Sequence, residues 1–175
     1  MLQEHARIVD FIATAEGVTG RKKLQKMVYI MKKLNVPFKE KYEFHIYGPY
    51  SEELTARIEE LCDMGFLSEA LEDKGSYVQY KYAVTDEGME FRNAVGASIP
   101  KNPEAAALLN AKSARFLELA STLLYFGHLE RDEQIAKLHS VKGKLNFTEA
   151  EIEEAYRFLG ELEQLKHSCI GRYLL

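Results

Sequence analysis

The feature that most constrains the fold of this chain is an apolar stripe within residues 20–34. Its members recur at helical spacing, at i, i+3, i+4, i+7 and i+10: Leu24, Met27, Val28, Met31 and Leu34. This period predicts an amphipathic helix that buries one face in a core and ends before Pro37. Lys and Arg occupy the positions between the apolar residues, so we expect an outward basic face that includes Lys23 and Lys26.

The basic face contrasts with the negative net charge of the whole chain. Seven basic residues and no Asp or Glu lie between Gly17 and Lys39, which leaves 16 basic against 27 acidic residues elsewhere. Lys and Arg on one helix face can neutralise the phosphates of a nucleic acid. The same pattern is also typical of an ordinary surface helix that faces solvent or a protein partner, and the charge pattern leaves both interpretations open.

Three other helices are predicted around this one. Residues 3–15 place apolar side chains at helical spacing. Ser51 is followed by two glutamates, which is typical of an N-cap with acids in the first turn of a helix over 51–63. Thr85 caps a helix over 86–95 in the same way.

Two further segments predict strands. Residues 42–46 alternate and are rich in β-formers, so we expect a short strand followed by a turn at Gly48 and Pro49. Two β-rich runs within residues 66–84 are separated by a turn that contains glycine, which predicts a hairpin. One face of its second strand would carry Val78, Tyr80, Tyr82 and Val84.

The expected order is helix, helix, strand, helix, hairpin, close to that of a winged-helix module. Residues 51–63 would take the place of the recognition helix and residues 66–84 that of the wing. In the usual order the small strand lies between the first two helices, whereas here we expect it between the second and third. The predicted fold class is therefore α+β, mainly α, with a variant winged-helix-like module at the N-terminal end.

A helical region follows a linker. Pro and Gly are frequent before residue 104, so we divide the chain into a module over 1–97, a linker over 98–103 and a C-terminal helical region over 104–175 that packs on the module. Its helices are expected at three ranges: 104–126, 132–141 and 148–166.

The start of the last helix carries the most specific local signal in the chain. Thr148 and Glu151 have the spacing of a capping box, in which each side chain bonds the other's backbone N–H. Phe147 and Ile152 flank them at the two positions of a hydrophobic staple. These four residues fix where that helix begins.

Several classes of protein lack support in the sequence. Cys62 and Cys169 have neither metal-ligand nor redox spacing, which predicts ordinary thiols in a reducing compartment. The histidines are scattered, and no Ser or Cys stands in a nucleophile motif. There is no apolar run of membrane-spanning length and no secretion-signal layout at the N-terminus. We expect a cytoplasmic protein without catalytic residues, metal or cofactor.

Two features bear on the kind of partner. The helix over 51–63 carries five acids and the single base Arg57, and a helix of net charge −4 would be repelled by phosphates in the major groove. Six tyrosines cluster in sequence around the strand and the wing, where they either fill the core or form a recognition surface. They are Tyr42, Tyr47, Tyr50, Tyr77, Tyr80 and Tyr82.

Three motifs carry a family resemblance. The runs Gly20–Ile30, Tyr47–Leu54 and Leu61–Leu67 are similar to the YwgA family of bacterial proteins, over most of the chain. Over about residues 20–66, the Lys-Leu-Gln-Lys core followed by Tyr-Gly-Pro resembles the Panacea domain, whose members act as antitoxins or adaptors by binding another protein. The resemblance implies a non-enzymatic, protein-binding role, and no catalytic residue transfers.

The leading hypothesis is a non-enzymatic cytoplasmic regulatory or adaptor protein that binds a protein partner through a winged-helix-like scaffold. The alternative is a DNA-binding transcriptional regulator that uses the basic helix 20–34 or the wing. A second copy of the chain is a further candidate partner. The candidate partner-binding residues are Arg21, Lys22, Lys23, Lys26, Tyr47 and Tyr50.

Overall fold

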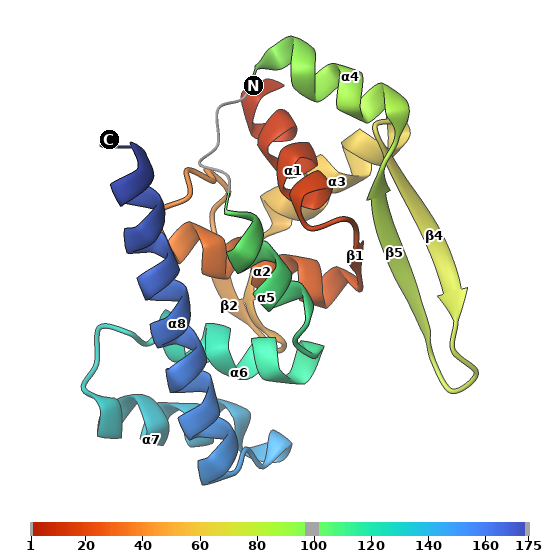
Figure 1. Cartoon of the computed structure of the whole chain (residues 1–175). Helices are drawn as coiled ribbons and strands as arrows, with labels where there is room; N and C mark the ends of the chain where they lie inside the picture. Colours follow the sequence, from red (N-terminus) through yellow and green to blue (C-terminus); the bar gives the residue numbers. More distant parts are fainter. Residues whose placement is uncertain (1, 97–101, 174–175) are drawn as a thin grey trace.

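The computed structural model describes residues 2–96 and 102–173, with side chains as far as Lys166. The chain has an α+β fold that is mainly α, with two small sheets (Figure 1). The predicted linker over 98–103 lies largely outside the described residues. The elements in chain order are α1 (Leu2–Thr14), β1 (Val18–Thr19), α2 (Arg21–Lys33), β2 (Glu43–His45), β3 (Gly48–Tyr50), α3 (Glu52–Asp63), β4 (Leu67–Asp73), β5 (Val78–Val84), α4 (Asp86–Val95), α5 (Pro103–Asn110), α6 (Ala114–Tyr125), α7 (Arg131–Lys142), a 3₁₀ turn (Gly143–Leu145) and α8 (Glu149–Tyr173).

Helix α2 lies near the centre of the molecule and packs against α6 and β3 (Figure 1). The predicted apolar stripe is confirmed, because all five of its residues are buried. The prediction of an entirely outward basic face is wrong at one position: Lys26 is only 2% exposed. Packing against α6 and β3 covers more of the helix than its apolar stripe alone.

The other N-terminal helices begin where their caps predict. The Ser51 hydroxyl accepts a hydrogen bond from Leu54 N–H at 3.1 Å, and the Thr85 hydroxyl accepts one from Gly88 N–H at 3.0 Å. These bonds satisfy backbone donors that the first helical turn leaves without partners.

The predicted hairpin is confirmed as β4 and β5, and it has an additional partner. Strand β1 pairs with β5, Val18 opposite Tyr82, so the sheet order is β1-β5-β4. A small strand thus does lie between the first two helices. Residues 18–19 are too few to show an alternating pattern, which is why the sequence pattern did not reveal it.

The strand after α2 also differs from expectation. Strand β2 pairs with β3, so Gly48 and Pro49 lie in a strand and the turn falls at Ile46 and Tyr47. Gly48 has a φ of +90°, and a Cβ added there would lie 3.4 Å from the Thr122 hydroxyl, so a side chain at this position would be strained. The Gly-Pro pair is therefore a close approach of backbone to α6, and not a turn.

The C-terminal helices are confirmed with one correction. The predicted helix over 104–126 is two helices, α5 and α6, and Ser113 caps the second by accepting from Phe116 N–H at 3.1 Å. The capping box is confirmed by bonds of 3.1 Å in both directions between Thr148 and Glu151. The staple residues Phe147 and Ile152 are both buried.

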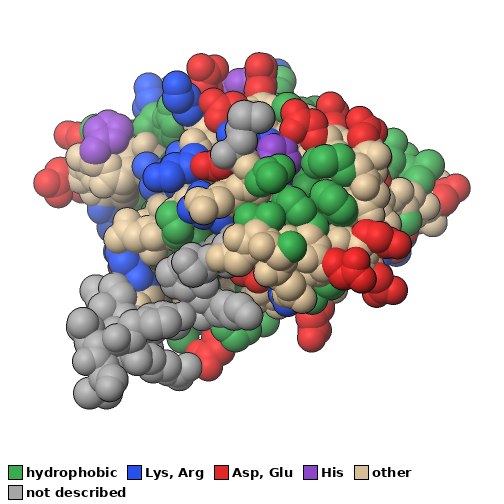
Figure 2. Space-filling view, turned by 90° about the horizontal axis from the view of Figure 1, so that it is seen from above, with side chains coloured by type: hydrophobic (Ala, Val, Ile, Leu, Met, Phe, Trp, Pro, Cys, Tyr) green, Lys and Arg blue, Asp and Glu red, His purple; other side chains and the backbone are tan. Residues whose placement is uncertain are grey.

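One hydrophobic core includes residues from α1–α3 and from α5–α8. The division between 1–97 and 104–175 stays a prediction. On the face shown in Figure 2, Lys and Arg side chains concentrate on the left, while Asp and Glu are spread along all the edges and hydrophobic side chains gather near the middle and right.

Candidate functional site

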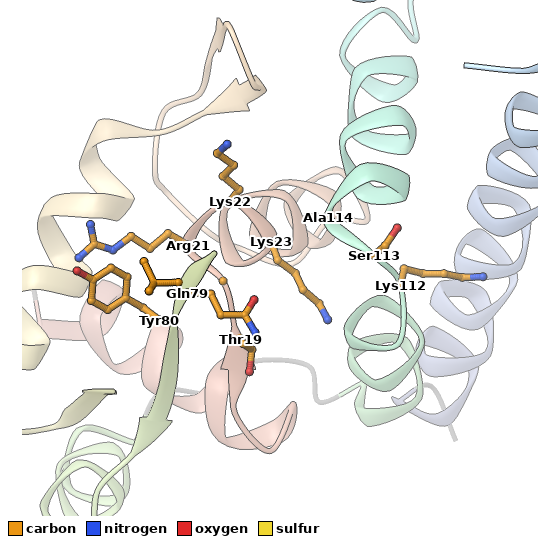
Figure 3. Close-up of a pocket in the computed structure, with 11 residues that line it drawn as sticks. Thr19, Arg21, Lys22, Lys23, Gln79, Tyr80, Lys112, Ser113 and Ala114 are labelled. Atoms are coloured by element: carbon orange, nitrogen blue, oxygen red, sulfur yellow. The ribbon is translucent and has the colours of Figure 1, made fainter. Parts of the chain in front are cut away.

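Two hollows lie on either side of the first turn of α2, and Arg21 and Lys22 line both of them. The first hollow, of about 540 Å³, lies between this turn, β5 and the turn from α5 to α6 (Figure 3). The second hollow, of about 270 Å³, lies between α2, α3 and the β2–β3 turn. The first turn of α2 is thus a ridge with a concave surface on each side.

The second hollow brings together five of the six candidate residues. Arg21, Lys22, Lys26, Tyr47 and Tyr50 all line it, although the basic and aromatic residues are 21 or more positions apart. Its other lining side chains include apolar Leu24 and Ile58, the acids Glu59 and Glu69, and Gln25, Thr55 and Tyr82. Both charge signs and an apolar floor are therefore present in one site.

A hydrogen-bonded network of three side chains forms one wall of the second hollow. Arg21 Nε donates to the Tyr82 hydroxyl at 2.8 Å, and that hydroxyl donates to Glu69 Oε2 at 2.7 Å. Arg21 Nη2 lies 3.2 Å from both Glu69 oxygens, and the guanidinium covers the Tyr80 ring at 4.1 Å. Burial raises the pKa of Tyr82, so its hydroxyl stays protonated and can donate to Glu69.

A second network includes three further lining residues of the second hollow, Gln25, Tyr50 and Thr55. Gln25 Nε2 donates to Ser51 O at 2.8 Å and to the Thr55 hydroxyl at 2.9 Å, while Gln25 Oε1 accepts from Ser51 N–H at 2.9 Å. The Tyr50 and Thr55 hydroxyls lie 2.8 Å apart. The amide of Gln25 therefore holds Thr55, whose hydroxyl in turn positions Tyr50 at the end of β3.

Lys26 on α2 is a buried contact of the β2–β3 hairpin. Its ammonium donates to Pro49 O at 2.6 Å, and burial lowers its pKa to about 8, an effect that Glu118 partly opposes. A buried lysine with one backbone acceptor positions the strand. The expectation that Lys26 is a surface contact is wrong.

Lys142 anchors the same hairpin at its turn. Its ammonium donates to Ile46 O and pairs with Glu118 Oε1 at 3.0 Å, although Lys142 is buried. Two buried lysines, Lys26 and Lys142, thus hold the hairpin against α6 on either side of Glu118.

The anchored turn presents its two tip residues to solvent. Ile46 is 82% exposed and Tyr47 is 49% exposed, and we call this pair the hairpin tip. The Lys22 ammonium lies 3.4 Å from the centre of the Tyr47 ring, which fixes the ring at the edge of the second hollow. Large apolar side chains held outward on an anchored turn are typical of a contact surface.

A third hollow, of about 520 Å³, lies on the other side of the hairpin tip. It is lined in part by His45 and Glu52, and it shares Tyr47, Tyr50 and Thr55 with the second hollow. The His45 and Tyr50 rings stack at 5.0 Å. The hairpin tip is therefore a ridge between two hollows that share a tyrosine boundary.

Lys23 is not part of this arrangement. In Figure 3 its side chain extends toward the space between α2 and the α5–α6 turn, and its ammonium donates to Asn110 O. Burial lowers the pKa of Lys23. Of the three hollows described, Lys23 lines the first and not the two that Tyr47 and Tyr50 line.

Sequence reasoning missed Gln25, Thr55, Glu69 and Tyr82 as site residues. Of these, Tyr82 had a signal, since it belongs to the cluster of six tyrosines around the strand and the hairpin. Glu69 had none, because its partner Arg21 lies 48 positions away.

The part of the chain that the structure describes contains neither a candidate metal site nor a candidate membrane span. There, no three side chains among His, Cys, Asp and Glu stand close enough to hold a metal ion. No helix among those residues has the length and apolarity needed to cross a bilayer. Cys62 is a free thiol, and the side chain of Cys169 lies outside the described residues.

Comparison with known proteins identifies the family. No family model matches the chain, so its likeness to the Panacea domain stays a prediction. A Bacillus subtilis (strain 168) protein described as uncharacterized protein YwgA is 47% identical over 165 residues, which cover 94% of this chain and 99% of that protein. Identity at this level over nearly the whole of both chains shows that this chain belongs to the YwgA family.

Proposed function

We propose that this protein is a non-enzymatic cytoplasmic regulatory or adaptor protein that binds a protein partner. The observation that carries the proposal is the hairpin tip, Ile46 and Tyr47, exposed between two hollows that share Tyr50 and Thr55. Protein interfaces favour such aromatic anchors next to pockets, surrounded by polar groups.

The second hollow suits an apolar or aromatic side chain of the partner. Leu24 and Ile58 supply an apolar floor, and Tyr47, Tyr50 and Tyr82 supply aromatic walls. The hydroxyls of Tyr50 and Tyr82 are already bonded within the protein, so the walls need not rearrange when a partner binds. A preformed hollow of this composition favours recognition over chemistry, because its lining contains no paired nucleophile and base.

We further propose that the scaffold is winged-helix-like. The order α1-β1-α2-α3-β4-β5, with β1 paired to the wing strand β5, supports this assignment, and the hairpin β2–β3 is then an insertion between α2 and α3. Helix α3 occupies the recognition position and exposes Glu52, Glu59 and Glu60. An acidic face in that position suits a protein partner better than a phosphate backbone.

The proposal is tested by affinity capture from the native host at moderate salt, with wild-type protein and two variants. Ile46→Asp places a charge on the hairpin tip without touching the core. Met64→Ser changes an exposed apolar residue at the end of α3 and is the matched control. A stoichiometric protein partner should appear with the wild type and with Met64→Ser and be lost with Ile46→Asp. Recovery of nucleic acid alone would reject the proposal, and light scattering identifies a second copy of this chain as the partner.

The alternative proposal is a DNA-binding regulator that uses α2 or the wing. Arg21, Lys22, Lys33 and Lys39 are exposed, which supports it. Against it, Arg21 is paired with Glu69 and Lys26 is buried, so fewer cations are free than the sequence suggested. This alternative predicts a mobility shift of duplex DNA that weakens steeply between about 50 and 200 mM salt. Absence of binding at the lower salt concentration would reject it.

A further inference from the structure

We propose that the first hollow binds an extended acidic peptide segment of the partner, which adds as a strand to the open edge of β5. The inference rests on the proposed function and specifies the chemistry of the partner. It concerns a surface separate from the hairpin tip, on the other side of the first turn of α2.

The edge of β5 is paired over only part of its length. Strand β1 pairs with Lys81 and Tyr82, and Gly20 N–H donates to Tyr80 O at 2.7 Å. The chain then turns away into α2. Strand β4 covers the other edge of β5 as far as Val78. Within the described residues, β5 therefore has no strand partner on the β1 side from Val78 to Gln79.

The backbone groups on this open edge point into the first hollow. In an antiparallel ladder, alternate residues direct their N–H and C=O groups to the same edge. Tyr80 directs its carbonyl to the β1 side, so Val78 directs its N–H and C=O to that side as well. Val78, Gln79 and Tyr80 all line the hollow, and Val78 is 58% exposed. An extended peptide can continue the ladder that β1 begins.

The charge of the first hollow selects an acidic peptide. Its lining includes Arg21, Lys22, Lys23 and Lys112 and contains no Asp or Glu. Lys23 extends toward the hollow in Figure 3, whereas Lys112 points toward α8. The ammonium of Lys23 donates to Asn110 O and has further donors to offer. A carboxylate on the added strand would therefore meet Lys23 first.

A peptide fits this hollow better than a nucleic acid does. Arg21 and Lys112 face the carboxylates of Glu69 and Glu154, so the number of free cations is small for a phosphate backbone. The open N–H and C=O groups of Val78 are matched by a peptide backbone, which offers both a donor and an acceptor, and phosphate offers acceptors only.

The test is fluorescence anisotropy with the full-length protein and three labelled octapeptides. The first alternates Val and Glu, the second alternates Val and Lys, and the third is the Val/Glu peptide with every backbone amide N-methylated. Only the first should bind, because the second has the wrong charge and the third has no N–H on either edge to donate to β5. N-methylation should weaken binding by about tenfold or more. Equal binding of the first and third peptides, or displacement of the first by duplex DNA, would overturn the inference.

Two variants locate the binding at the edge of β5. Val78→Pro removes the edge N–H while leaving the pairing with β4, and Lys23→Gln removes the charge in the hollow. Both should weaken binding of the Val/Glu peptide by about tenfold, while Val78→Ala and Lys33→Gln should not. If circular dichroism shows that Val78→Pro does not fold, the comparison of the methylated and unmethylated peptides with the wild-type protein still tests whether the peptide pairs as a strand. A native partner that is lost with Ile46→Asp but bound as before by Val78→Pro would reject this inference and leave the proposed function standing.

Discussion

Gln25 on α2 and Ser51 at the start of α3 are joined by two hydrogen bonds across 26 positions of sequence. The Gln25 side-chain amide donates to Ser51 O at 2.8 Å and accepts from Ser51 N–H at 2.9 Å. The Tyr42 hydroxyl donates to the backbone carbonyl of Gln25 at 3.0 Å. The Lys-Leu-Gln-Lys and Gly-Pro-Tyr-Ser runs are therefore structural partners, joined through Gln25 and Ser51.

Replacing Gln25 should destabilise the protein. Gln25→Leu removes the partner of the buried Ser51 N–H, while Ser51 O keeps its bond from Thr55 N–H at 3.3 Å. A buried donor left unsatisfied costs about 1–3 kcal/mol. Urea denaturation followed by circular dichroism measures the loss. Gln3→Leu, on the exposed face of α1, is the control and should change the free energy of unfolding by less than about 0.5 kcal/mol. Equal effects of the two substitutions would show that the bonds to Ser51 contribute little.

Charge reversal should distinguish Lys26 from the surface lysines. Lys26→Glu places a carboxylate beside Pro49 O and near Glu118, and breaking a buried charged contact of this kind costs about 3–5 kcal/mol. Lys39→Glu, at an exposed position, should stay within about 0.5 kcal/mol. Chemical denaturation gives both values. A small effect of Lys26→Glu would mean that its ammonium is not held under the hairpin.

The pKa of Lys26 predicts a pH dependence of stability. Burial lowers this pKa from 10.5 to about 8 in the folded protein, so the unfolded chain binds more protons between these values. The contribution of Lys26 to the free energy of unfolding should therefore increase as pH rises through about 8 toward 10.5. Denaturation of the wild type and of Lys26→Met between about pH 8 and pH 9.5 measures this gain in stability. The contributions of groups that both proteins contain, such as the Cys62 thiol, cancel in the difference between the two.

In Lys26→Met that gain should be absent. A wild-type stability that falls relative to Lys26→Met over the same range would contradict the account. The comparison also separates Lys26 from the charges that face it, since Lys22, Glu118 and Lys142 are present in both proteins.

Truncation of the apolar stripe should be costly, because α2 is central. Leu24 and Met27 are fully buried, and truncating either to Ala should lower the free energy of unfolding by about 2–5 kcal/mol through lost burial and a cavity. Leu71→Ala on β4 is the control, since Leu71 is 59% exposed. Thermal denaturation should show a large fall in Tm for the first two variants and little change for the third.

Local signals in the sequence predicted local structure well. The bonds between Thr148 and Glu151 and the caps at Ser51 and Thr85 lie where the sequence placed them, because each depends on residues within one helical turn. The break between α5 and α6 was missed, although Ser113 is an N-cap residue type, since neither Pro nor Gly marks it.

Features that depend on distant segments could not be read in this way. Lys26 looked like a surface residue because its neighbours in sequence are lysines, but β3 and α6 cover it. The Gly-Pro pair predicted a turn at Gly48. Its pairing with His45 shows that Gly48 lies in a strand, and the sequence alone could not reveal that pairing. Five of the six candidate residues line the second hollow, but the sequence did not predict that hollow, and the contacts of Arg21 with Glu69 and Tyr82 required the fold.

Site-specific photocrosslinking from the hairpin tip tests the central claim most directly. A benzophenone amino acid in place of Ile46 lies on the ridge between the second and third hollows, and the same group in place of Met64 lies at the end of α3. After irradiation in the native host, the probe at position 46 should yield one discrete protein adduct, identified by mass spectrometry, and the probe at position 64 should yield none. Equal labelling from both positions, or adducts of nucleic acid alone, would contradict the assignment of the hairpin tip as a partner-binding surface.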